Sequence, residues 1–126
     1  MIPAIGQGAL GIETREDDPT VEEIVGVLDH ESTRIAVETE RAFLMRMGGG
    51  CQVPMAAHAV VNGDMVEITA AVVHPDGTPF VRDVMTAAKG TVSIGTRLAD
   101  TLTERGGADI MKRVLGPDWA PGPAVR

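Results

Sequence analysis

The sequence is short of the residues that proteins use for crosslinking, membrane insertion and export. Cys51 is the only cysteine among 126 residues, so an internal disulfide cannot form. We find no signal peptide, and no apolar run reaches the roughly 18 residues that a membrane-spanning helix needs. These absences predict a cytoplasmic protein with no membrane partner.

Aromatic and basic residues are also scarce. Phe43, Phe80 and Trp119 are the only aromatic residues, and the formal net charge is −7 with no long run of Lys or Arg. A stacking platform for bases needs aromatic side chains, and a sequence-independent grip on phosphates needs clustered positive charge. We therefore expect no nucleic-acid partner, and a core built from aliphatic residues and methionine.

The pattern for a metal site is missing as well. His30, His58 and His74 are scattered and have no metal-ligand spacing with Cys51. The early acidic residues lie where helix starts and solvated faces are expected, rather than as a catalytic pair. The sequence therefore predicts no metal site.

What the sequence does contain is a clear alternation of periods. Apolar residues at helical spacing predict helices near residues 19–28, 31–47, 92–105 and 108–115. Period-two alternation between glycine-containing turns predicts strands near residues 55–61, 66–72 and 79–86. The predicted fold class is α+β, a three-stranded antiparallel sheet with helices packed on one face. We assign this domain to residues 19–115 and expect the proline-rich residues 116–126 to form an irregular tail.

The stretch Gly48–Pro54 (GGGCQVP) joins the second predicted helix to the first strand. Three consecutive glycines lose much backbone entropy on folding, so an open backbone that permits close approach must have a use here. The preceding helix end does not favour a thiolate. Cys51 is therefore either an inert buried thiol or a functional one, and its sequence context leaves both interpretations open.

Three polar side chains are further candidates for ligand binding. Arg41 and Arg46 lie on the helix that leads into the cysteine turn, where they either face an anionic ligand at Cys51 or form an ordinary solvated face. Gln7 lies between two glycines and offers its amide either to a ligand or to its own turn.

Three blocks of the sequence resemble one enzyme family. They are Pro3–Glu13 (PAIGQGALGIE), Glu40–Leu44 (ERAFL) and Gly49–Pro54 (GGCQVP), in this order. Together they resemble porphobilinogen deaminase, also called hydroxymethylbilane synthase. The resemblance runs from residue 2 to about residue 115 and corresponds only to the C-terminal portion of that enzyme.

The resemblance implies a cofactor site. In that family the cysteine of the GGCQVP turn carries a dipyrromethane cofactor through a thioether bond, which implies the same role for Cys51. The matching motifs also imply that five further residues bind the cofactor. They are Gln7, Gly8, Gly49, Gly50 and Arg41.

An activity is implied as well. The full enzyme of that family condenses four porphobilinogen molecules on the dipyrromethane primer, with loss of ammonia, and releases hydroxymethylbilane for tetrapyrrole biosynthesis. The implied partners are porphobilinogen and the linear pyrrole intermediates. The family's catalytic aspartate and arginine-rich face match no motif here, so we expect no catalytic residue in this chain and no turnover by the chain alone.

The same resemblance assigns residues 1–18 to a missing N-terminal domain, as a strand and turn. Leu10–Arg15 alternates like a strand, and in the family this segment pairs within another domain's sheet. Without that sheet, we expect residues 2–15 to be disordered or to pair with a sheet edge of another copy. The full-length enzyme is expected to be a monomer.

Two alternative hypotheses remain at this stage. In the first, the chain is a non-catalytic binding module in which Cys51 is a structural or redox-active thiol. In the second, it is a separately encoded anchor that assembles with a partner chain bearing the other domains.

Overall fold

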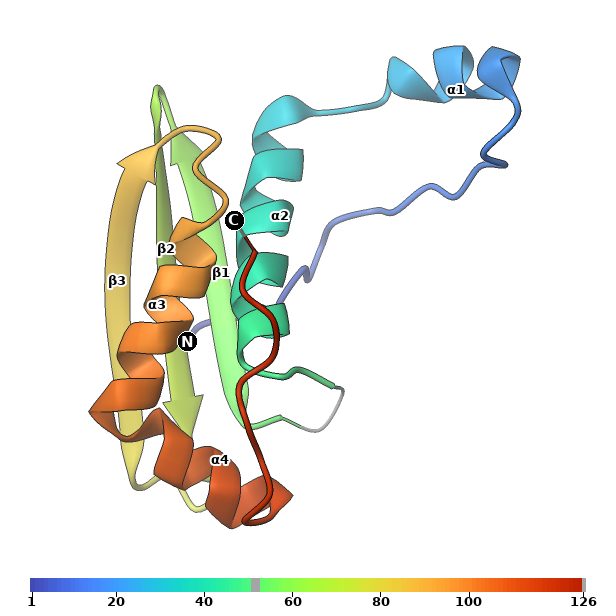
Figure 1. Ribbon diagram of the computed structural model, residues 1–126. Helices are drawn as coiled ribbons and strands as arrows, with labels where there is room; N and C mark the ends of the chain where they lie inside the picture. Colours follow the sequence, from blue (N-terminus) through green and yellow to red (C-terminus); the bar gives the residue numbers. More distant parts are fainter. Residues whose placement is uncertain (51–52, 126) are drawn as a thin grey trace.

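The computed structural model describes residues 1–50 and 53–125, and Cys51, on which the main prediction falls, lies outside the described residues. The chain forms an antiparallel sheet in the order β1-β2-β3. Its strands are β1 (Met55–Asn62), β2 (Met65–Val73) and β3 (Phe80–Ala88). Three helices cover one face of this sheet (Figure 1): α2 (Glu31–Arg46), α3 (Ile94–Leu102) and α4 (Ala108–Leu115). The predicted α+β fold is confirmed.

The strands form where the sequence alternates between apolar and polar residues. Ala57 pairs with Ala70, and Ile68 pairs with Met85, so small and branched side chains from neighbouring strands lie on the same face. The two hairpins turn at Gly63 and Gly77, whose φ angles of +58° and +87° favour glycine. The meander predicted from these turn signals is therefore present.

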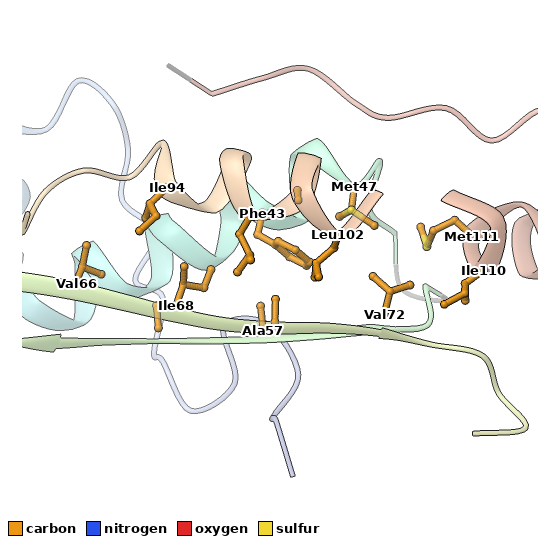
Figure 2. Close-up of a cluster of buried hydrophobic side chains, with 14 of the residues drawn as sticks. Phe43, Met47, Ala57, Val66, Ile68, Val72, Ile94, Leu102, Ile110 and Met111 are labelled. Atoms are coloured by element: carbon orange, nitrogen blue, oxygen red, sulfur yellow. The ribbon is translucent and has the colours of Figure 1, made fainter. Parts of the chain in front are cut away.

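The core lies between the inner face of the sheet and the helices (Figure 2). Phe43 and Met47 of the α2 end are fully buried, and they face Leu102 of α3 and Met111 of α4 across the same cluster. Complete burial of an apolar side chain of this size contributes about 1.5–3 kcal/mol. The end of α2 that precedes the cysteine turn is thus held by the core of the domain.

Helices α2 and α3 approach each other at a glycine. A Cβ atom added to Gly95 would lie 2.2 Å from the carbonyl oxygen of Thr39, a distance that real structures do not tolerate. The Thr39 hydroxyl donates to the carbonyl of Ile35 at 2.7 Å, which satisfies it inside the buried helix. This close contact fixes α3 directly on α2.

The ends of the helices agree with the signals in the sequence, with one addition. Asp18 accepts a hydrogen bond from the amide of Val21 and caps α1, as its position before proline predicts. His30 caps α2 in the same way by accepting from the amide of Thr33, a role that its side chain did not suggest. After α3 the wide turn η1 (Thr103–Gly107) contains Gly106 with φ of +112°, so the predicted glycine stop is present.

Helix α1 (Pro19–Gly26) corrects the prediction that all helices pack on one face. It has no buried residue and stands away from the sheet, on an arm formed by residues 10–30 (Figure 1). Ile24 and Leu28 are 64% and 66% exposed although they belong to its apolar stripe. The prediction was wrong for α1 because an amphipathic pattern indicates a buried face without indicating what buries it.

The segment Leu10–Arg15, which the resemblance assigns to a strand in the sheet of another domain, does not form a strand in this chain. These residues have no regular secondary structure, and Leu10 is 96% exposed. A strand needs a neighbour whose backbone completes its hydrogen bonds, and none lies beside this segment among the described residues. The alternating pattern therefore does not produce a strand here.

The expectation that residues 2–15 are disordered or paired with another copy does not hold for their first half. Ile5 packs against the hydrophobic core, and the amide of Gly6 donates to Glu40 of α2. Residues 10–15 extend beyond this contact and are exposed. Pairing of this segment with another copy stays a prediction.

Helices within the described part of the chain are short. The longest, α2, has 16 residues, and no helix there has both the length and the apolar composition to cross a bilayer.

Candidate functional site

The cysteine turn emerges from the C-terminal end of α2. Gly48 follows the last residues of the helix with φ of +70°, which is the left-handed conformation that stops a helix. On the far side, Val53 and Pro54 lead directly into β1. The segment of the sequence that contains Cys51 therefore connects a core-packed helix to an edge strand of the sheet.

The two glycines next to the cysteine differ in their surroundings. A Cβ atom added to Gly49 would lie 2.2 Å from Leu44 Cδ1 and 2.8 Å from the carbonyl oxygen of Leu44, to which the Gly49 amide donates. Among the described residues, nothing lies within 4 Å of a Cβ atom added to Gly50. Gly49 is thus required by the packing of the helix end, whereas Gly50 leaves open space beside the cysteine.

An open hollow of about 470 Å³ begins at the same turn. Its described lining is mostly apolar and contains no Lys or Arg. The lining residues are Val53, Pro54, Met55, Ala56, Val73, His74, Pro75 and Val114. This hollow has room for a ring system, but its described residues offer no cation to a carboxylate.

The two arginines of α2 lie in different settings. Arg46 Nε donates to Asp100 Oδ1 of α3 at 2.6 Å, and its Nη1 donates to the carbonyl of Gly122 at 2.7 Å. Arg41 is exposed and lines a separate hollow between α2 and the arm. Arg46 therefore joins α2 to α3 and the tail. Neither arginine belongs to the described lining of the hollow beside the turn.

Gln7 and Gly8 lie in a turn that packs beside the middle of α2. Gly8 has φ of +86°, and the side-chain oxygen of Gln7 accepts from the amide of Ala4 at 3.2 Å. Both residues line a hollow of about 410 Å³ together with His58 and Glu40. Glu40 precedes Met47 by seven residues, which is about 10 Å along a helix. The described residues thus form two clusters, one around Gln7 and one around Gly49.

Glu40 organises the first of these clusters, and the sequence analysis gave it no role of its own. Its carboxylate is 5% exposed, and it accepts from the amide of Gly6 at 2.6 Å and from the amide of Ala59 at 2.8 Å. His58 Nδ1 lies 3.3 Å from the same carboxylate. A single buried side chain therefore joins the Gly6–Gly8 turn, helix α2 and strand β1.

Neighbouring charges shift the pKa of two side chains in the first turn of α2. The pKa of Glu31 is lowered by a hydrogen bond from Lys89 and by its positive charge, with the two side chains 2.6 Å apart. The pKa of Arg34 is raised by its hydrogen bond with Asp29. Within residues 1–50 and 53–125, no group of three His, Asp or Glu side chains is arranged to hold a metal ion.

Fold and turn together define a class of domain. It is an α+β domain whose central helix ends in a glycine-rich turn that carries a single cysteine.

Comparison with known proteins identifies the family. The sequence model described as "Porphobilinogen deaminase, C-terminal domain" matches residues 34–104. Porphobilinogen deaminase of Pelotomaculum thermopropionicum is 45% identical over 113 residues, which cover 89% of this chain and 36% of that protein. The chain belongs to this family, as the three sequence blocks predicted.

Two further relatives give the same result. Porphobilinogen deaminase of Pelobacter propionicus is 46% identical over 114 residues, covering 90% of this chain and 37% of that protein. That of Syntrophotalea carbinolica is 41% identical over 125 residues, covering 98% of this chain and 39% of that protein. The chain thus spans little more than a third of the length of these relatives, and the last likeness extends through the tail.

Proposed function

We propose that this chain is the cofactor-anchoring C-terminal part of a porphobilinogen deaminase, in which Cys51 holds a dipyrromethane cofactor through a thioether bond. The observation that carries the proposal is the position of the GGCQVP turn, directly after a helix whose C-terminal end is held in the core by the fully buried Phe43 and Met47. An anchor must stay fixed while the attached chain of pyrroles grows. A cysteine next to a core-packed helix end meets this requirement.

The described residues fit the anchoring of a bulky group. Gly50 leaves open space where a side chain would stand, and the hollow that begins at Val53 is lined mainly by apolar groups suited to pyrrole rings. When bound, the cofactor supplies the primer on which further pyrroles are condensed. The role of this chain is to hold that primer at a fixed place and to leave space beside it.

Binding of the carboxylate groups of the pyrroles is a different requirement, which we assign to regions outside this chain. No Lys or Arg lines the described part of the hollow at the turn, and the net charge of −7 does not favour an anionic ligand. The complete protein would condense four porphobilinogen molecules to hydroxymethylbilane in the cytoplasm. This chain alone would not convert porphobilinogen.

Gln7 and Gly8 are the second contribution that we propose for this chain. Their turn is held by Glu40 at a defined place beside α2, about 10 Å along the helix from its C-terminal end. A linear chain of pyrroles that grows from Cys51 has the reach to contact both clusters. In this scheme Gln7 binds the cofactor through its side-chain amide, and Arg41 binds it from the side of α2 that faces the arm.

The proposal is tested by intact-mass measurement. The chain is joined to the N-terminal two thirds of the Pelotomaculum relative, expressed, and weighed with and without the substitution Cys51→Ser. We expect the mass of two porphobilinogen units less two ammonia molecules on the parent protein, and no adduct on the variant. An unmodified Cys51 in a joined protein that releases hydroxymethylbilane would contradict the proposal. An inactive joined protein whose thiol is unmodified and readily oxidised would favour the binding-module hypothesis.

A further inference from the structure

The tail, residues 116–125, contains no helix or strand, yet it is bound along the helices. In Figure 1 it leaves α4 and returns beside α2, where Trp119 and Gly122 contact the helix end. Further on, the hydroxyl of buried Thr96 donates to the carbonyl of Val125 at 3.1 Å and accepts from its amide at 3.3 Å. The tail is thus attached at both ends of its course.

Its contacts fall on the backbone groups that the helix end leaves without partners. The last carbonyls of any α-helix lack intrahelical donors. In α2 the amide of Gly48 donates to Met45 and that of Gly49 donates to Leu44. The next two carbonyls are served by the tail instead. The amide of Gly122 donates to Arg46 at 2.9 Å, and Trp119 Nε1 donates to Met47 at 3.2 Å.

The contact at Gly122 is reciprocal and close. While its amide donates to the carbonyl of Arg46, its own carbonyl accepts from the Arg46 side chain at 2.7 Å. The guanidinium also pairs with Asp100, so one side chain connects α2, α3 and the tail. A Cβ atom added to Gly122 would lie 2.1 Å from the carbonyl oxygen of Met45, which only a glycine avoids.

We propose that the tail is a positioning element for the cysteine turn, with Trp119 and Gly122 as its principal residues. By completing the hydrogen bonds of Arg46 and Met47, it fixes the direction in which the chain leaves α2 toward Cys51. Its importance for the cofactor rests on the proposed function, whereas its control of the turn does not. Neither Trp119 nor Gly122 is a catalytic residue, because each acts through the helix end.

Trp119 itself provides the measurement. It is the only tryptophan in a chain without tyrosine, so intrinsic fluorescence reports on the tail, and Cys51 as the only cysteine reports on the turn. We compare Gly122→Ala with Pro123→Ala, a matched substitution at an exposed neighbour. Both variants are examined by Trp119 emission and by the rate of Cys51 alkylation with iodoacetamide.

For Gly122→Ala we expect emission shifted to longer wavelength and alkylation accelerated about fivefold, the factor that losing one net hydrogen bond gives to local opening. Pro123→Ala should change neither. A shifted emission with an unchanged alkylation rate would overturn the proposal, and so would an unshifted emission. If Gly122→Ala fails to fold, Trp119→Phe replaces it. That variant removes the indole donor together with part of the ring, and an unchanged alkylation rate there would overturn the proposal equally.

These measurements need no cofactor. A missing adduct in the joined protein would therefore contradict the proposed function without affecting this inference, and an unchanged alkylation rate would contradict the inference alone.

Discussion

The backbone nitrogen of Gly6 lies 2.6 Å from Oε2 of Glu40, a residue 34 positions further along the chain. The other oxygen of the same carboxylate accepts from the amide of Ala59 in β1. Glu40 therefore provides the link by which the Gly6–Gly8 turn is held on the body, and its removal has consequences for both partners.

We predict that Glu40→Gln destabilises the folded chain by about 1–3 kcal/mol, the cost of leaving a buried hydrogen-bonding group without a partner. The amide NH₂ of glutamine cannot accept, so either Gly6 or Ala59 loses its bond. Urea unfolding measures the change, and hydrogen exchange at both amides locates it. The matched control is Glu38→Gln on the same helix. The Glu38 side chain is 45% exposed, and its ion pair with Arg34 is loose at 3.9 Å. Equal effects of the two substitutions would contradict the prediction.

The two glycines beside the cysteine allow a second prediction. Gly49→Ala forces its methyl group into Leu44 and should destabilise the chain by about 1–3 kcal/mol, as overpacking does. Gly50→Ala meets open space and should leave stability unchanged or raise it by up to about 1 kcal/mol. Thermal unfolding of the isolated chain distinguishes them. If Gly50→Ala is as destabilising as Gly49→Ala, the space beside Gly50 is not open.

In the protein joined to the N-terminal region, the same two substitutions distinguish an effect on packing from an effect on the space available to the cofactor. Gly50→Ala should then reduce the adduct on Cys51 although the domain remains stable. This result would assign the space beside Gly50 to the cofactor, and an undiminished adduct would remove Gly50 from the proposed site.

The elements of the fold were predictable because their signals are local. Gly48 stops α2, Asp18 starts α1, and Gly63 lies in a hairpin turn, each through the conformation of a few neighbouring residues. The glycine turn was predictable as a candidate site for the same reason. Its cysteine lies outside the described residues, so its role stays a proposal.

The features that sequence analysis missed all depend on distant partners. Glu40 received no role of its own from the sequence, because nothing near it in the sequence indicates Gly6 or Ala59. Arg46 was a candidate for an anionic ligand until the fold brought Asp100 and Gly122 to it. A buried carboxylate or a paired arginine is recognised only when its partners from other elements are known.

A third prediction concerns pH. Lys89 lowers the pKa of Glu31 through a hydrogen bond and its charge. Because the folded pKa lies below the unfolded one, the stabilisation is present above the unfolded pKa of about 4.3 and is lost as the pH falls through the folded pKa. Lys89→Met should return the Glu31 pKa toward its ordinary value, as measured by NMR titration of the carboxyl carbon. Lys112→Met, which alters an exposed lysine of α4, should leave it unchanged. An unmoved Glu31 titration in Lys89→Met would contradict the pairing.

The last prediction concerns the arm, where apolar side chains are exposed on two segments. Leu10 and Ile12 are 96% and 55% exposed, and Ile24 of α1 is 64% exposed. Apolar surface of this kind drives association when a partner surface is available, and an extended segment offers unpaired backbone groups as well. We therefore expect the isolated chain to self-associate through residues 2–15 as its concentration rises, as measured by sedimentation velocity.

The controls for this prediction must separate the arm from other exposed apolar residues, including those on the uncovered face of the sheet. Val84 of β3 is 50% exposed there. Leu10→Lys should reduce association, because it places a charge in the extended segment, whereas Val84→Lys should leave it unchanged. The opposite result would place the contact on the sheet. A chain that remains monomeric at every concentration would show that the arm needs no partner. Joining the N-terminal region should abolish association if that region covers the arm, because the same apolar side chains would then be buried within one molecule.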